Sequence, residues 1–191
     1  MPVALEVAST LEADLGLIIS RKIPISLNPE GGIGAAADDG TVILNEEAVR
    51  KIDLSRQQIE YEASKVRAEI KQRSLLYKGD RPPVRVNGRT AIIIDDGLAS
   101  GFTMMAAVQS VRHRQPKEVV VAVPVASAMA VKRVEKVADK VVTCYTGFMP
   151  KFYVSDFYRY WYDLSDDDVI RYLKEWRMQQ FRSHIMPPQD K

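Results

Sequence analysis

The sequence has little of several features that would indicate a particular class of protein. Among its 191 residues there is one cysteine, Cys144, which excludes an internal disulfide framework and is compatible with a reducing compartment. Lysine and arginine number 27 against 25 aspartate and glutamate residues, so no strongly basic field argues for a nucleic-acid partner. No apolar run approaches the roughly 18 residues of a membrane span. The N-terminal stretch lacks the basic region of a secretory signal, and we expect a soluble cytoplasmic protein.

Two common phosphate-binding motifs and any metal-ligand cluster are also missing. The Walker A pattern Gly-x-x-x-x-Gly-Lys-[Ser/Thr] does not occur, and neither does the glycine fingerprint of dinucleotide-binding folds. The two histidines, His113 and His184, have no ligand residues beside them in the sequence. We interpret both histidines and Cys144 as structural, and we predict no metal site built by protein ligands alone.

One short stretch carries the strongest chemical signal. Residues 92–103 read IIIDDGLASGFT. The apolar run over residues 91–94 has no alternation, which is typical of a strand covered on both faces of a parallel sheet. Asp95 and Asp96 follow at its carboxyl end, where open α/β sheets place their ligands. The generic alternative is that acids at a strand end only cap a helix or a turn.

The turn after the two aspartates is suited to an anion. Gly97 and Gly101 allow the backbone to turn sharply and to approach a ligand closely. From Thr103 onward, apolar residues recur at helical spacing, so the turn presents N–H groups at the positive end of a helix. Two carboxylates can accept hydrogen bonds from the vicinal hydroxyls of a ribose, while the turn over residues 99–103 can hold the 5-phosphate of the same sugar.

Strands alternate with helices along the rest of the chain, which predicts an α/β fold with a mostly parallel sheet and helices on both faces. The stretch over residues 23–34 is rich in proline and glycine, and we predict no regular element there; residues 35–44 are predicted to form a hairpin. We expect a single domain over residues 1–182 and a loose tail over residues 183–191. Strands are predicted at 15–19, 91–94, 119–123 and 141–145, and helices over 3–11 and from Ser55, Thr103, Ser127 and Ser165.

The 92–103 stretch resembles the ribose-phosphate signature of type I phosphoribosyltransferases, in which four apolar residues precede two acids and a Thr/Ser-Gly-x-Thr turn. Other stretches are similar to one uncharacterised subfamily: RKIPISLNPEGGIGA (21–35), DDGTVILNEE, VVVAVPVAS (119–127) and the segment 156–169. The likeness extends from about Pro2 to Trp176. It implies a type I phosphoribosyltransferase-like sheet of five parallel strands, with a flexible loop and hairpin over residues 23–44 that closes over the active site.

The resemblance also implies roles for individual residues. Asp95 and Asp96 would hold the ribose hydroxyls. Arg21 and Lys22 would face the pyrophosphate leaving group as catalytic residues; the plainer alternative for this pair is a solvated strand end. The cofactor would be Mg²⁺. The 5-phosphate would be bound by Ala99, Ser100, Gly101, Phe102 and Thr103.

The sequence departs from the family pattern at two places. Family members have a strand and a Pro-Arg-Gly-Gly turn, which helps to bind pyrophosphate, just before the stretch that matches Pro2; we expect these either to be lost or to lie upstream of Met1. Some purine enzymes carry a third acid at the position of Ala99. The acceptor pocket would come from residues 146–162, which are rich in aromatic side chains, although core or dimer packing is the commoner role of such a cluster.

The resulting hypothesis is an Mg²⁺-dependent enzyme, expected to be a homodimer. It would transfer a phosphoribosyl group from phosphoribosyl pyrophosphate to a nitrogenous acceptor such as a nucleobase, and release pyrophosphate. Two other classes stay open: a non-catalytic regulator that binds phosphoribosyl pyrophosphate or a nucleotide, and a degenerate homologue that pairs with another chain. A regulator acting on DNA or RNA is disfavoured by the near-neutral charge and by the lack of an appended binding module.

Overall fold

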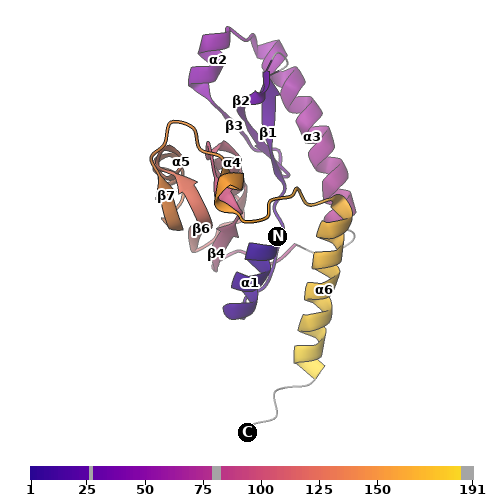
Figure 1. Cartoon of the computed structure of the whole chain (residues 1–191). Helices are drawn as coiled ribbons and strands as arrows, with labels where there is room; N and C mark the ends of the chain where they lie inside the picture. The colour runs from indigo at the N-terminus through magenta and orange to yellow at the C-terminus, as the bar shows by residue number, and fades with distance from the viewer. Residues whose placement is uncertain (26–27, 79–82, 186–191) are drawn as a thin grey trace.

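The chain is organised around two sheets, as Figure 1 shows. The computed structural model describes residues 1–25, 28–78 and 83–185. The first part of the chain contains α1 (Pro2–Thr10), β1 (Ser20–Ile25), β2 (Asn28–Ala37), β3 (Val42–Leu44), α2 (Glu46–Ile52) and α3 (Arg56–Lys78). The second part contains β4 (Thr90–Ile94), β5 (Gly97–Leu98), α4 (Phe102–Arg112), β6 (Glu118–Ser127), α5 (Ala128–Val134), β7 (Lys140–Gly147), a 3₁₀ turn (Val154–Phe157) and α6 (Asp166–Ile185).

The parallel sheet has β6 at its centre. On one side β6 pairs with β4 and then with β5, and on the other side it pairs with β7, all in parallel register. The predicted α/β fold class is therefore confirmed. The sheet has four strands, β4 to β7, in the described part of the chain, rather than the five that the resemblance implied.

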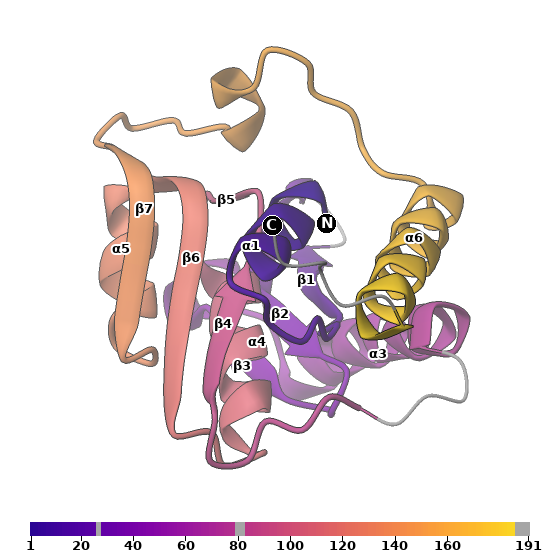
Figure 2. The ribbon, with the colours of Figure 1, turned by 90° about the horizontal axis from the view of Figure 1, so that it is seen from below.

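Helices α4 and α5 cover one face of this sheet, and α1 lies toward the other (Figure 2). Val119, Val121 and Val134 are completely buried on the covered face, where Ile93 also packs. On the opposite face Ile92 keeps 39% of its surface exposed. The prediction that residues 91–94 are covered on both faces is therefore wrong, because an all-apolar run does not reveal how much of each face its neighbours cover.

The second sheet is antiparallel, with strand order β1-β2-β3. The prediction of no regular element over residues 23–34 is wrong, because β1 continues to Ile25 and β2 begins at Asn28; residues 26–27 lie outside the described part. Shifts in the pairing register on both sides of Pro24 accommodate this proline within the ladder. A strand was predicted over residues 15–19, but these residues form none, and β1 begins just after them at Ser20. Ser20 pairs with Ala37, the last residue of β2.

Several local predictions are confirmed. The hairpin over residues 35–44 is formed by the end of β2 and by β3, and Gly40 in its turn has a φ of 92°. Ser55 and Gln58 form the reciprocal cap that precedes α3. The Ser127 hydroxyl accepts a hydrogen bond from the Ala130 N–H at the start of α5.

The end of the chain differs from the prediction. A loose tail was expected from residue 183, but α6 continues to Ile185, and residues 186–191 lie outside the described part.

Helix α4 joins the two sheets. Its Ala106 is completely buried against Ala35 and Ala37 of β2. Alanines at these contacts allow the helix and the strand to approach closely, which brings the antiparallel sheet beside the first turn of α4. In the described part of the chain, no helix combines the length and the apolar character that crossing a lipid bilayer requires.

Candidate functional site

The two predicted carboxylates lie in the connection between β4 and β5, at the carboxyl end of the parallel sheet. The Asp96 N–H donates a hydrogen bond to the Asp95 carboxylate over 3.0 Å. From the segment after β7, the Tyr158 hydroxyl donates to the Asp96 carbonyl over 2.7 Å. The backbone of Asp96 is thus held at both its N–H and its carbonyl, and the first of these bonds also orients the Asp95 carboxylate.

Both carboxylates have raised pKa values. The Asp95 side chain is exposed, but nearby protein atoms remove part of its hydration; this desolvation and the Asp96 charge raise the pKa of Asp95 to about 6. Desolvation also raises the pKa of Asp96. The positive charge of the Met1 amino group, before α1, acts in the opposite direction and lowers it. The two acids therefore repel each other in a partly dry site, and a bound cation or a hydroxyl donor would relieve this repulsion.

The predicted phosphate turn forms the start of α4. Gly101 has a φ of 85°, in the left-handed region that glycine adopts most easily, and it caps the helix that begins at Phe102. No side chain caps this helix, and the Met105 N–H bonds to the Gly101 carbonyl over 2.9 Å. The first-turn N–H groups before Met105 thus point out of the helix end, where the dipole favours an anion.

Two residues beyond the motif hold this turn from behind. The Ser127 hydroxyl donates to the Ala99 carbonyl over 2.7 Å. The Arg133 guanidinium donates to the Ser100 carbonyl over 2.8 Å and lies 4.8 Å from the centre of the Phe102 ring. Sequence reasoning recognised Ser127 only as a helix start and did not single out Arg133. No local pattern could have revealed them, because about 30 residues separate each from its partner.

The aromatic cluster expected to form the acceptor pocket is divided between packing and exposure. The Phe157 ring packs against Tyr145 and Phe152, with ring centres about 5 Å apart. In contrast, 85% of Phe148 and 81% of Tyr160 are exposed. Part of the cluster therefore has the packing role that was the commoner alternative, while its exposed members stay candidates for contact with a ligand.

The structure separates the two predicted catalytic cations. They are neighbours on β1, so their side chains point to opposite faces of the antiparallel sheet. Arg21 lies on the face toward α3, where it forms an ion pair with Glu69 over 3.2 Å. Lys22 lies directly opposite Ala35 of β2, so both side chains are on the same face of the sheet. That face packs against Phe102 of the phosphate turn. Lys22 is therefore on the face nearer the candidate site, and Arg21 is not.

The donor set fits a cation that shares its ligands with a substrate. Mg²⁺ prefers carboxylate and water oxygens and is commonly held by one or two carboxylates together with substrate phosphates. Asp95 and Asp96 supply such carboxylates, and desolvation, which a bound cation would offset, raises the pKa of both. Among the described residues, no group of three or more acidic, histidine or cysteine side chains could hold the ion alone.

Comparisons with known proteins identify relatives of this chain. Two Mycobacterium tuberculosis proteins, from strains CDC 1551 and H37Rv, are each named "Putative phosphoribosyl transferase" and are 35% identical to this chain over 173 residues. The match covers 91% of this chain, which spans only 39% of the length of those relatives. The crystal structure of TT1426 from Thermus thermophilus is also 35% identical, with a TM-score of 0.72 over 91% of this chain and 82% of that one.

A family model described as "Phosphoribosyl transferase domain" matches residues 38–155. The matched region contains both carboxylates, the whole phosphate turn and the two residues that hold it from behind. It does not include Arg21 or Lys22. Because the model covers more than half of the chain, and because the relatives are similar over nearly all of it, the chain belongs to the phosphoribosyl transferase family.

Proposed function

We propose that this chain transfers a phosphoribosyl group from phosphoribosyl pyrophosphate to a nitrogenous acceptor of the nucleobase type. One observation carries the proposal: two adjacent carboxylates lie one turn before a left-handed glycine that opens an uncapped helix. These features match the two polar ends of a ribose 5-phosphate. The carboxylates accept hydrogen bonds from two hydroxyls, while the N–H groups of the helix end bind a phosphate.

In the proposed reaction, the protein positions the sugar by both of its ends. Asp95 and Asp96 hold the ribose hydroxyls, and the turn over residues 99–103 holds the 5-phosphate. Bound Mg²⁺ would supply positive charge to the pyrophosphate oxygens and bring the two carboxylates and the substrate into one assembly. Fixing the sugar at two points restricts its motion while the bond between C1 and the pyrophosphate oxygen breaks and the bond to the acceptor nitrogen forms.

Lys22 is the residue of this site best placed to act on the leaving group. Negative charge accumulates on pyrophosphate as the bond to C1 breaks. A cation that meets this charge stabilises the transition state more than the bound substrate. The Lys22 side chain lies on the sheet face that packs against the phosphate turn through Ala35.

The first test is a calorimetric titration of the chain with phosphoribosyl pyrophosphate, with and without Mg²⁺. Binding that requires Mg²⁺, followed by pyrophosphate release when nucleobases are added, supports the proposed enzyme. Binding without release for any base would favour the non-catalytic regulator instead. If the folded chain bound no phosphoribosyl pyrophosphate in either condition, the proposed enzyme would be wrong, and a regulator that binds a nucleotide or a degenerate homologue would be left.

A pH dependence follows from the raised pKa of Asp95. The proton must leave this side chain before it can accept two hydroxyl hydrogen bonds, so affinity should be full above about pH 7 and should fall as the pH drops through 6. The contribution of Asp95 to the stability of the fold changes with pH in the opposite direction. Between the usual pKa of 3.8 and about 6, the folded state retains a proton that the unfolded state loses, so this group's contribution to stability decreases as the pH rises.

Carbon-13 NMR of the aspartate carboxyl groups measures this directly in the free protein, where the phosphates of the substrate cannot contribute. We expect one carboxyl to titrate near pH 6. The matched control is Asp96→Asn, which removes the neighbouring charge and should move the Asp95 midpoint to lower pH. A carboxyl that titrates near 4 in both proteins would show that the proposed repulsion does not exist.

Lys22→Ala should lower kcat by about a hundredfold and change the affinity for phosphoribosyl pyrophosphate much less, as expected for a group that acts mainly in the transition state. Arg21→Ala removes the same charge from the opposite face of the strand and is the matched control, with an expected effect below about threefold. Steady-state kinetics and calorimetry on both variants separate the two residues. A larger loss with Arg21→Ala would contradict this assignment. It would mean that the hairpin rearranges during the reaction so that Arg21 reaches the leaving group, the catalytic role first predicted for it.

A further inference from the structure

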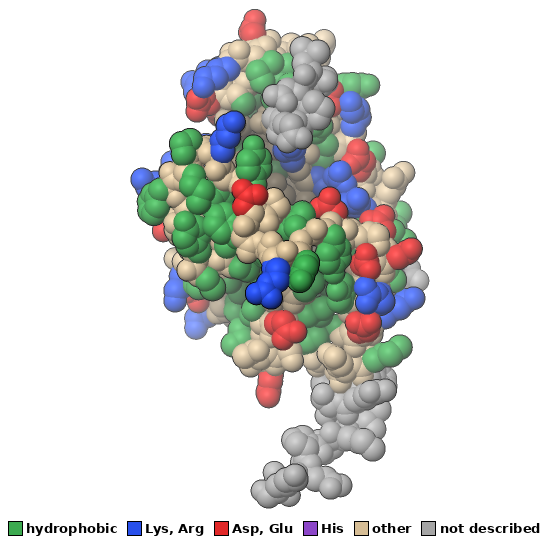
Figure 3. Space-filling model, viewed as in Figure 1, with side chains coloured by type: hydrophobic (Ala, Val, Ile, Leu, Met, Phe, Trp, Pro, Cys, Tyr) green, Lys and Arg blue, Asp and Glu red, His purple; other side chains and the backbone are tan. Residues whose placement is uncertain are grey.

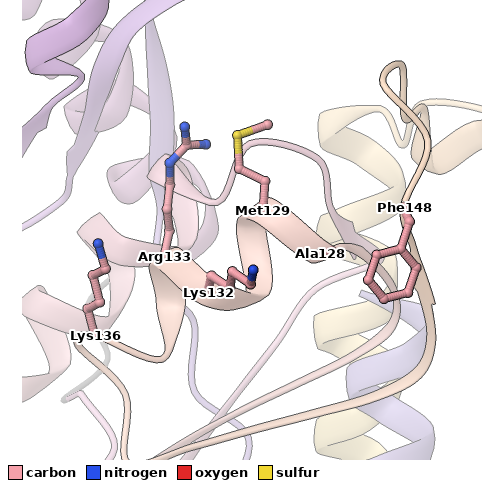
Figure 4. A pocket seen from close by; sticks show the side chains of 6 residues that line it. All are labelled: Ala128, Met129, Lys132, Arg133, Lys136 and Phe148. Atoms are coloured by element: carbon pink, nitrogen blue, oxygen red, sulfur yellow. The ribbon is translucent and has the colours of Figure 1, made fainter.

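A basic cleft lies directly behind the phosphate turn, on the outer side of α5. It has a volume of about 430 Å³, within the range of small-molecule sites. Figure 4 shows four of its side chains projecting from α5 and the turn after it, with Phe148 across from the start of the helix. The cleft is lined by Ala128, Met129, Lys132, Arg133, Lys136 and Phe148.

The lining combines strong positive charge with apolar surface. Three of its six residues are cations, and none is acidic. Lys132 lies on α5 and Lys136 in the turn after it, and because both line the same cleft their like charges repel each other. One acidic group on another element, Glu47 of α2, interacts with the charge of Arg133, but its main partner is Lys51. An anion bound in the cleft would therefore relieve a repulsion that remains in the protein alone.

The apolar side of the cleft is unusually exposed. Phe148 has 85% of its surface accessible and Met129 has 56%. Figure 3 shows hydrophobic side chains gathered over α5 and the segment after β7, with basic side chains at the margin. A planar ring that packs on Phe148 and Met129 would bury this surface while its phosphates reach the lysines.

We propose that this cleft binds a nucleotide and that its occupancy changes the affinity of the phosphate turn for phosphoribosyl pyrophosphate. Arg133 supplies the connection, because it lines the cleft and also donates to the Ser100 carbonyl within the turn. A phosphate that attracts the guanidinium weakens this hydrogen bond and its contact with Phe102, and so alters the site that binds the 5-phosphate. This regulatory role rests on the proposed function; the binding of the nucleotide itself does not.

The test uses a fluorescent ATP derivative, mant-ATP, titrated into the full chain at about physiological ionic strength. Lys132→Gln with Lys136→Gln should weaken its binding by about tenfold or more, because two charge-assisted hydrogen bonds to phosphate are lost. Lys71→Gln with Lys117→Gln is the matched control: both lysines are exposed and lie outside α5, so mant-ATP binding should be unchanged. Inorganic tripolyphosphate should compete poorly, because it has no base to pack on Phe148.

A second comparison separates the cleft from the candidate active site. In the Asp95→Asn, Asp96→Asn protein, mant-ATP affinity should be retained, while the cleft variant should bind phosphoribosyl pyrophosphate as the unaltered chain does. The proposal is overturned if mant-ATP does not bind, if tripolyphosphate binds equally well, or if binding is lost in the aspartate variant and kept in the lysine variant. A failure of the proposed function looks different: phosphoribosyl pyrophosphate does not bind, whatever happens to mant-ATP.

The coupling has its own measurement. Saturating ATP should change the calorimetric Kd of phosphoribosyl pyrophosphate by about threefold or more, in line with typical coupling between two sites. Arg133→Met retains an unbranched apolar side chain beside Phe102 but has no guanidinium, so ATP should no longer change that Kd. If ATP binds at the cleft and the Kd does not change in the unaltered chain, the regulatory part of the proposal is wrong.

Discussion

Replacing Asp95 and Asp96 together by asparagine is expected to abolish the binding of phosphoribosyl pyrophosphate while the fold persists. Each carboxylate accepts charge-assisted hydrogen bonds in the proposed complex, and such bonds contribute about 1.5–3 kcal/mol each. Losing two therefore weakens binding by about two to four orders of magnitude. Calorimetry with Mg²⁺ present measures the loss.

Stability provides an internal control for this variant. Because the pKa values of both aspartates are raised, their ionised forms are less favourable in the folded protein than in the unfolded chain. Neutral asparagines remove this cost, so the double variant should be at least as stable as the unaltered chain above about pH 7. Lost binding together with an unchanged or higher Tm assigns the effect to the site. Retained affinity would show that the two carboxylates do not bind the substrate.

Gly34→Ala is expected to produce the largest loss of stability among single substitutions in the hairpin. A Cβ at Gly34 would lie 2.1 Å from the Ile43 carbonyl oxygen and 2.9 Å from the Leu44 Cα, both backbone atoms of β3. These atoms cannot move away without breaking the pairing of β2 with β3. We expect a loss of about 3 kcal/mol or more in the free energy of unfolding, at the upper end of overpacking effects.

Gly16→Ala is the matched control for this prediction. There the new Cβ would lie 3.5 Å from Val84, an ordinary contact distance, and the change should be neutral or slightly stabilising. Urea denaturation of both variants measures the difference. Equal midpoints would mean that β2 and β3 do not pair in the register described, and the placement of Lys22 beside the phosphate turn would need revision as well.

Local patterns predicted where the two carboxylates, the glycine turn and the start of α4 lie in the fold. The two carboxylates, the left-handed glycine and the start of α4 are contiguous in the chain, so their spacing alone determines how they meet. The caps at Ser55 and Ser127 were predictable for the same reason, because each cap involves residues three positions apart. The hairpin over residues 35–44 was likewise apparent from its turn residues.

The antiparallel strands β1 and β2 were harder to recognise. Proline and glycine weaken every local signal for a strand, and here the ladder forms because the two segments pair with each other through an irregular register around Pro24. Ile92 presents the opposite case, since its apolar neighbours predicted burial and the structure leaves it partly exposed. In both cases the outcome depends on a partner segment that a single stretch of sequence does not contain.

The sequence by itself determined the ribose-phosphate motif and the α/β class, because both depend on the order and spacing of neighbouring residues. Only the tertiary structure decided that Lys22 and Arg21 lie on opposite faces of β1, and that Arg133 and Tyr158 hold the site from distant segments. Backbone alternation makes two neighbouring side chains diverge, but which face meets the candidate site depends on how the two sheets pack around α4. That packing arises from contacts between residues far apart in the chain, such as Ala35 with Ala106.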